Sequence, residues 1–147
     1  MKFTQFIGET MVKAAISGYY GFKNFGDEAI LAVLVNHLKK LENVDITVFS
    51  SDTDFTSKTY SVNSVKRFDL KNVIKTVKEA DILVSGGGSL LQDVTSFKSL
   101  VYYSLIIALG LLFNKKVVIF AQGIGPLNSK PAQFIVKNLL KHCSLVT

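Results

Sequence analysis

Three glycine-rich segments hold the residues whose types and spacing could do chemistry. They are GYYGFKNFGDE (18–28), GGGSLLQD (86–93) and AQGIGP (121–126). Glycine lets backbone N–H groups approach a ligand closely and accepts positive φ. Amide and carboxylate side chains suit sugar hydroxyls, which both donate and accept hydrogen bonds. The candidate polar residues in these segments are Asn24, Asp27, Glu28, Ser89, Gln92, Asp93 and Gln122.

The spacing in these segments favours an anionic or hydroxyl-rich ligand over a dinucleotide. A helix is expected after each segment, and helix N-termini attract phosphate or carboxylate groups. Neither the Gly-x-Gly-x-x-Gly fingerprint nor a Walker A lysine is completed. Tyr19, Tyr20 and Phe22 offer flat apolar surface to a sugar or a base. Structural alternatives remain open: turn packing for the glycines and aromatic residues, and helix stabilisation for Asp27, Glu28 and Asp93.

Alternating strands and helices must position these segments. Short apolar runs predict strands, and apolar residues at helical spacing predict helices between them. Expected strands span 12–17, 45–50, 62–67, 81–85 and 116–120, and expected helices span 27–41, 69–80, 100–113 and a stretch capped by Ser129, with 51–61 a loop. This pattern predicts an α/β fold with a Rossmann-like parallel sheet and helices on both faces. All three glycine segments then lie at the carboxyl edge of the sheet.

Charge and cysteine content exclude several functional classes. The net charge is +6, but the basic residues are nearly all lysine and Arg67 is the only arginine. Because base readout and bidentate phosphate binding favour arginine, we expect no nucleic-acid partner. Solvated lysines are the main interpretation, with weak attraction to anionic lipid or a phosphorylated substrate as the alternative. One cysteine and two distant histidines predict neither a disulfide framework nor a metal site.

The ends of the chain and its most apolar segment indicate where in the cell the protein is expected. Residues 1–10 lack the apolar core of a secretory signal and form an expected extension before a domain spanning 11–147. The apolar segment 100–113 spans about 21 Å as a helix, shorter than the roughly 30 Å of a bilayer core. We therefore expect a buried helix in a cytoplasmic protein, with peripheral membrane contact as the alternative. The sequence stops within an apparent strand at 145–147, so we expect a missing C-terminal part.

The same three segments resemble the polysaccharide pyruvyl transferase family. The similar stretches are SGYYGFKNFGDEAIL (17–31), VSGGGSLLQDVTS (84–96) and FAQGIGPL (120–127). The resemblance is strongest to bacterial cell-wall members, which attach a ketal-linked pyruvate to N-acetylmannosamine. It implies the N-terminal half of a GT-B-type protein, with phosphoenolpyruvate as co-substrate and no other cofactor. It also implies a glycan acceptor which, if lipid-linked, places the protein at the inner face of the membrane.

The resemblance assigns roles to particular residues. It implies acceptor contacts by the N-terminal half, with Asp27 or Asp93 orienting or deprotonating the acceptor hydroxyl and with no metal. The implied substrate-binding residues are Gly18, Tyr19, Gly21, Asn24, Gly26, Glu28, Gly86, Gly87, Gly88, Ser89, Gln92, Gln122, Gly123 and Gly125. None of the segments contains an arginine, although a phosphate and a carboxylate call for one. We therefore expect the donor clamp in the missing half and no activity from this chain alone.

Two other functions are compatible with the residues. One is half of a GT-B-type glycosyltransferase that uses a nucleotide sugar. The other is a non-catalytic domain that binds a glycan or a partner, with its exposed sheet edge buried in a homo-oligomer. Comparing the binding of phosphoenolpyruvate with that of nucleotide sugars distinguishes a pyruvyl transferase from the glycosyltransferase.

Overall fold

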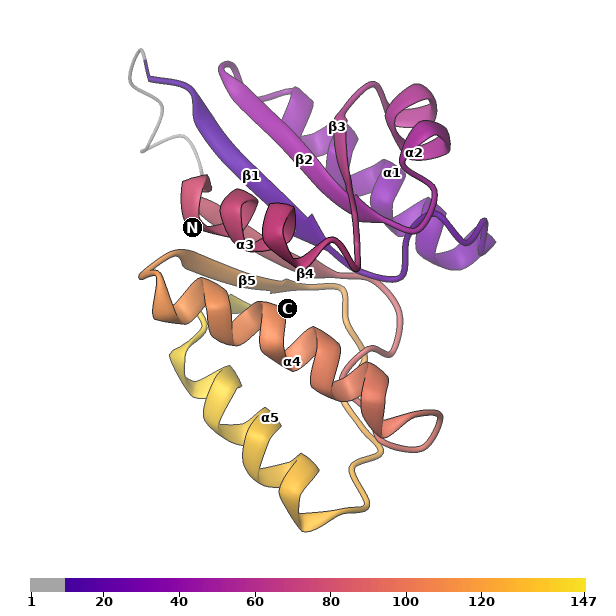
Figure 1. Cartoon of the computed structure of the whole chain (residues 1–147), viewed down its shortest axis with the longest axis vertical. Coiled ribbons are helices and arrows are strands. Elements are labelled where there is room, and N and C mark those ends of the chain that lie inside the picture. The colour runs from indigo at the N-terminus through magenta and orange to yellow at the C-terminus, as the bar shows by residue number, and fades with distance from the viewer. Residues whose placement is uncertain (1–9) are drawn as a thin grey trace.

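A computed structural model describes residues 10–147, so most of the predicted extension at 1–10 lies outside the described residues. A six-stranded sheet alternates with five helices, and every strand pair is parallel (Figure 1). In chain order the elements are β1 (Val12–Ser17), α1 (Phe25–Lys39), β2 (Val44–Ser50), α2 (Thr53–Tyr60), β3 (Asn63–Lys66), α3 (Leu70–Glu79), β4 (Ile82–Gly86), α4 (Phe97–Leu112), β5 (Lys116–Phe120), α5 (Lys130–His142) and β6 (Leu145–Val146).

The sheet order is β3-β2-β1-β4-β5-β6, which confirms the predicted Rossmann-like α/β fold. Because successive strand residues point to opposite faces, the apolar strands supply two cores. Ala14 and Ile16 of β1 pack with α1 on one face, whereas Ala15 packs with α3, α4 and α5 on the other. Covering both faces explains why the strands are continuous apolar runs rather than alternating ones.

Polar side chains fix where the helices begin. Asp69 accepts a hydrogen bond from the Asn72 N–H and Ser129 from the Ala132 N–H, which confirms both predicted N-caps. The cap of α4 is Ser96 and not Asp93, the residue offered as a candidate cap. The N-cap of α1 is Asn24, so that helix begins at Phe25, two residues earlier than expected.

The structure corrects one element, because α2 occupies the segment 51–61 that was predicted to be a loop. Its eight residues carry little apolar periodicity, and Thr56 is their one buried member. Asp52 caps α2 by accepting from the Phe55 N–H, and the helix packs beside β2 and β3. A local cap and tertiary contacts thus stabilise a helix that the hydrophobic pattern does not reveal.

The apolar segment 100–113 forms α4 up to Leu112, with Phe113 as the C-cap, and is packed against the sheet. Leu100, Ile106 and Ile107 are buried in the core, which confirms the predicted buried helix. Across residues 10–147, none of the helices combines the length and hydrophobicity needed to cross a membrane.

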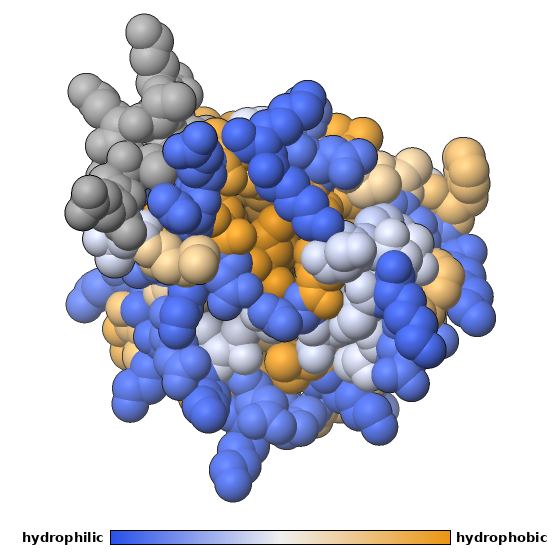
Figure 2. Space-filling model, turned by 90° about the horizontal axis from the view of Figure 1, so that it is seen from above, coloured by the Kyte–Doolittle hydropathy of each residue, from blue (hydrophilic) through white to orange (hydrophobic). Residues whose placement is uncertain are grey.

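Most lysines of the described residues are exposed, as the interpretation of solvated lysines requires. Seen from above the view of Figure 1, hydrophilic residues dominate the outline of the molecule and hydrophobic residues show in a central hollow (Figure 2). Arg67 differs from the lysines, since its side chain is buried.

Candidate functional site

The three glycine-rich segments follow β1, β4 and β5, which are neighbours in the sheet. All three therefore leave the carboxyl ends of adjacent parallel strands, where open α/β sheets bind ligands. We call the surface formed by residues 18–28, 86–93 and 121–126 the carboxyl rim. The structure thus brings the predicted site residues together at one edge, while their roles in binding remain predictions.

Backbone hydrogen bonds hold the second and third segments side by side. The Gly123 N–H donates to the Gly88 carbonyl at 2.9 Å, and the Gly125 N–H donates to the Leu91 carbonyl at 2.8 Å. A parallel bridge pairs Leu91 with Ile124. Gly87 and Gly88 have φ values of +82° and +63°, which side-chain-bearing residues rarely adopt. The glycines here are thus required by backbone geometry, and the segments form one continuous surface.

Tyr20 joins the first segment to the second. Its ring is fully buried, and its hydroxyl donates to the Gly86 carbonyl at 2.5 Å. Gly18 is needed below this ring, because a Cβ there would collide with the Tyr20 side chain and the Gly86 carbonyl. Burial raises the pKa of the Tyr20 hydroxyl above its usual range, so it stays a donor. Tyr20 is therefore a structural clamp, in contrast to the ligand-facing surface expected from the sequence.

Asp27 lies in the first turn of α1 and faces the second segment. A Cβ built on Gly88 would lie 2.5 Å from Asp27 Oδ1, so the carboxylate borders the glycine run. Burial, and then the negative charge of Glu28, raise the pKa of Asp27. Because Asn24 caps the helix, the Asp27 side chain is not needed for that purpose. A carboxylate with a raised pKa at the rim fits the general-base role predicted for Asp27, which stays a prediction.

Glu28 has both carboxylate oxygens engaged by the protein. The Gly21 N–H donates to Oε1 at 2.9 Å, and the Tyr60 hydroxyl donates to Oε2 at 2.6 Å. Burial, followed by the hydrogen bond to Glu28, raises the pKa of the Tyr60 hydroxyl. Gly21 itself has φ +80° and no room for a Cβ beside the Ser50 side chain. These contacts favour a structural role for Glu28, which secures the first segment to α2.

Asp93 bridges the second segment to the start of α5. Its carboxylate accepts from the Asn128 N–H at 2.8 and 3.0 Å and from the Ser129 N–H at 2.8 Å. These backbone hydrogen bonds lower the pKa of Asp93. A carboxylate held in its charged form by three bonds is a weak base. The catalytic role predicted for Asp93 remains a prediction, and its contacts make Asp27 the better candidate.

The remaining polar residues of the rim differ in what they offer a ligand. Gln122 is buried, accepts from the Ser85 hydroxyl at 3.1 Å, and leaves its Nε2 without a partner. Gln92 instead accepts from the Val94 and Thr95 N–H groups, so its carbonyl oxygen is used locally. Ser89 is exposed at the rim. The Gln122 Nε2 is therefore a buried donor without a partner, whereas Ser89 is the polar side chain of this group that is open to a ligand.

Tyr19 and Phe22 project from the first segment as a stacked pair. Their ring centroids lie 3.9 Å apart with an angle of 6° between the planes. Both rings are partly exposed, at 38% and 40%. They therefore keep the flat apolar surface that the sequence predicted for a ligand, although they also stack on each other as turn packing requires.

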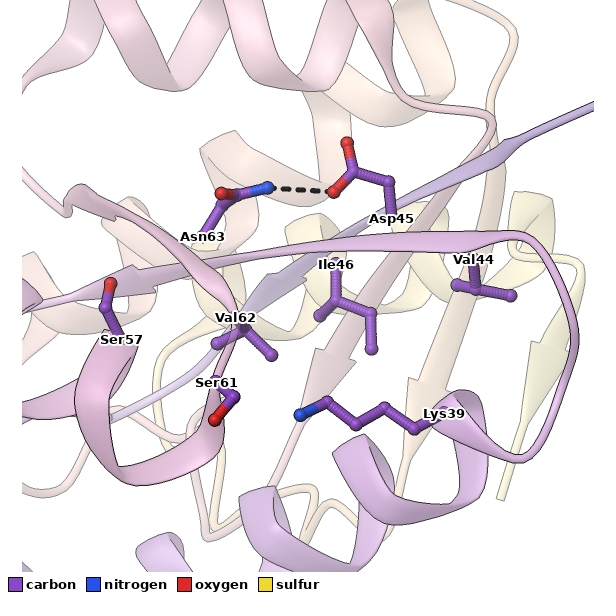
Figure 3. Close-up of a pocket in the computed structure, with 8 residues that line it drawn as sticks. All are labelled: Lys39, Val44, Asp45, Ile46, Ser57, Ser61, Val62 and Asn63. Carbon is purple, nitrogen blue, oxygen red and sulfur yellow. Dashed lines mark hydrogen bonds between the residues drawn. The ribbon is translucent and has the colours of Figure 1, made fainter.

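Two cavities are lined by residues outside the glycine segments. One, of about 310 Å³, is at the amino ends of β2 and β3, where Asn63 donates to Asp45 at 2.8 Å and Lys39 reaches the same hollow (Figure 3). The second, of about 370 Å³, is at the carboxyl ends of the same strands, beside Arg67. Within residues 10–147, no cluster of three or more His, Cys, Asp or Glu side chains could hold a metal ion.

The arrangement of strands, helices and rim defines a Rossmann-like α/β domain with its candidate site at the carboxyl edge. The family model for polysaccharide pyruvyl transferase matches residues 24–147. The chain therefore belongs to the polysaccharide pyruvyl transferase family. The match contains the second and third segments whole and the first from Asn24 onward. No curated protein matches the chain significantly.

Proposed function

We propose that this domain takes part in transferring a pyruvyl group from phosphoenolpyruvate to a cell-wall polysaccharide sugar, where it is held as a ketal. Membership of the polysaccharide pyruvyl transferase family over residues 24–147 is the observation that carries this proposal. The convergence of the three segments on one rim supports it.

The acceptor sugar is the substrate that the carboxyl rim suits best. The Asp27 carboxylate borders the glycine run and can accept from a sugar hydroxyl, and Gln122 Nε2 is a buried donor without a partner. The stacked rings of Tyr19 and Phe22 offer an apolar surface to a sugar face. We propose N-acetylmannosamine as this sugar. If the acceptor is lipid-linked, the reaction takes place in the cytoplasm at the inner face of the membrane.

In the proposed reaction, Asp27 accepts the proton of the attacking sugar hydroxyl. The enol CH₂ carbon of phosphoenolpyruvate gains a proton and becomes a methyl group, while the sugar oxygen bonds to the adjacent carbon. Phosphate then leaves with its bridging oxygen, and a second hydroxyl of the same sugar closes the ketal and gives up its proton. The two sugar hydroxyls give up two protons in all. One balances the proton that was added to the CH₂ carbon, and the other leaves with phosphate. The raised pKa of Asp27 suits proton transfer near neutral pH better than an ordinary carboxylate does.

The direct test uses the enzyme that carries this domain. It is incubated with phosphoenolpyruvate and an N-acetylmannosamine glycoside, and both phosphate release and sugar mass are measured. The proposal predicts acceptor-dependent phosphate release and a sugar that has gained one pyruvate ketal. The isolated chain is expected to bind the acceptor without turnover. Transfer from a nucleotide sugar, with phosphoenolpyruvate left intact, contradicts the proposal.

A further inference from the structure

Arg67 is enclosed by aromatic rings at the carboxyl end of β3. Its side chain is only 7% exposed, although it is the one arginine of the sequence. Five rings surround its guanidinium carbon at 4.7 to 6.0 Å. The rings come from three elements, namely the first glycine segment, the end of β3 and α4, and belong to Tyr19, Phe22, Phe68, Tyr102 and Tyr103.

The buried guanidinium has no anionic partner among residues 10–147. Its Nε is buried and makes no hydrogen bond, and the buried Tyr103 hydroxyl beside it makes none either. Burying an unpaired charge is costly, and cation–π contacts offset that cost only in part. The Arg67 Nε–H and the Tyr103 O–H therefore have no acceptor for their protons, although the guanidinium lies close enough to the Tyr103 hydroxyl to act against the burial that raises its pKa.

The position of Arg67 points to a ligand. Residue 67 directly follows β3, so it lies at the same carboxyl edge as the rim. A cavity of about 370 Å³ is lined by Arg67, Lys66 and Phe68 together with Ser50, Ser51 and Asp69. Asp69 is the acidic group in that lining, and its carboxylate is already bonded to the Asn72 N–H and side-chain amide. Asp69 therefore does not serve as the missing partner.

We propose that Arg67 and Tyr103 form an anion subsite that binds a phosphate or carboxylate group of the substrate. An oxyanion only accepts hydrogen bonds, so one bound in the cavity beside Arg67 supplies the acceptor that Nε–H lacks, and Tyr103 lies beside the same guanidinium. Burial raises the pKa of the Tyr103 hydroxyl to about 12, so it remains protonated and able to donate. The planar guanidinium presents several donors to one phosphate or carboxylate, which a lysine cannot do.

This subsite deepens the proposed function and rests on it for the identity of the anion. Phosphoenolpyruvate carries both a phosphate and a carboxylate, whereas a lipid-linked or nucleotide-linked acceptor carries a diphosphate. Tyr19 and Phe22 belong to the rim and also contact Arg67, so the anion would bind beside the acceptor sugar. Arg67 lies outside all three glycine segments, so the motif pattern does not single it out as a site residue.

The test follows the Arg67 Nε–H resonance of the full chain by NMR while inorganic phosphate is added. Binding at the subsite shifts this resonance in a saturable way. Arg67→Lys and Tyr103→Phe each weaken phosphate binding at least about tenfold, because each removes a bond to a charged group. Lys137→Met removes a full unit of positive charge from exposed α5, which neither test variant does, and leaves the affinity unchanged. If Arg67→Lys does not fold, the wild-type titration and the Tyr103→Phe variant still test the anion subsite.

Further titrations identify the source of the anion. Phosphoenolpyruvate, pyruvate and a uridine diphosphate sugar are compared with inorganic phosphate on the same resonance. Tighter binding of phosphoenolpyruvate than of phosphate assigns the donor, and tighter binding of the diphosphate sugar assigns the acceptor. An Arg67 Nε–H resonance that none of these ligands moves overturns the subsite, as does equal weakening by Lys137→Met. Anion binding without ketal formation by the complete enzyme refutes the proposed function and leaves the subsite standing.

Discussion

The hydroxyl of Tyr20 connects the first glycine segment to the second, so its removal tests how the rim is assembled. Tyr20→Phe keeps the buried ring and deletes the bond to the Gly86 carbonyl, which is 2.5 Å long and buried. Losing a buried hydrogen bond while its acceptor stays in place costs about 1–3 kcal/mol of unfolding free energy. For a chain of this size, each kcal/mol lowers the melting temperature by about 2–4 °C.

Urea unfolding followed by circular dichroism measures this loss, with Tyr19→Phe as the matched control. Tyr19 is partly exposed, and within the described residues its hydroxyl has no hydrogen-bond partner. Its deletion should therefore change the free energy of unfolding by no more than about 0.5 kcal/mol. If Tyr20→Phe is as stable as Tyr19→Phe, the clamp between the two segments is refuted.

Three further predictions concern the carboxylates and glycines of the rim. Asp27→Asn should lower turnover of the complete enzyme at least about tenfold in a phosphate-release assay. Because the pKa of Asp27 is raised, its charged form destabilises the fold. The Asn variant should therefore melt at a higher temperature than wild type at pH 7, and this difference should vanish in acid. Gly88→Ala should lower both the melting temperature and turnover, since its Cβ meets Asp27 Oδ1 at a φ of +63°, whereas Gly26→Ala, with 3.6 Å to its nearest neighbour, should leave stability intact. Asp93→Asn should melt lower than wild type above about pH 4, and the difference should shrink as pH falls through the lowered pKa, because the carboxylate stabilises the fold only while charged. Equal melting curves for Asp93→Asn and wild type at pH 7 would contradict its bridging role.

The strands and the edge that they share could be predicted because both depend on local pattern. Continuous apolar runs mark buried parallel strands, and glycine at their ends marks close backbone approach. The helix α2 was missed because its apolar pattern is weak and its stability depends on contacts with β2 and β3, although Asp52 offers a local capping signal. Contacts with strands elsewhere in the chain cannot be predicted from the local sequence.

Hydrogen bonds between side chains and partners distant in the sequence could not be predicted either. Glu28 and Tyr60 are 32 residues apart, and Tyr20 and Gly86 are 66 apart. Nothing near Tyr20 distinguishes a buried clamp from an exposed ligand platform, and nothing near Arg67 shows that Tyr102 and Tyr103 will surround it. The composition did carry one signal, because a single arginine among many lysines marks a position where the planar guanidinium matters.

The central claim is that segments far apart in the chain form one rim that binds the acceptor sugar. The most direct measurement is an amide chemical-shift titration of the chain with the methyl glycoside of N-acetylmannosamine. The account predicts that residues of all three segments, including Asp27, Gly88 and Gly123, shift together with a single dissociation constant. Shifts confined to one segment, or to the cavity around Lys39 and Asn63, would contradict it.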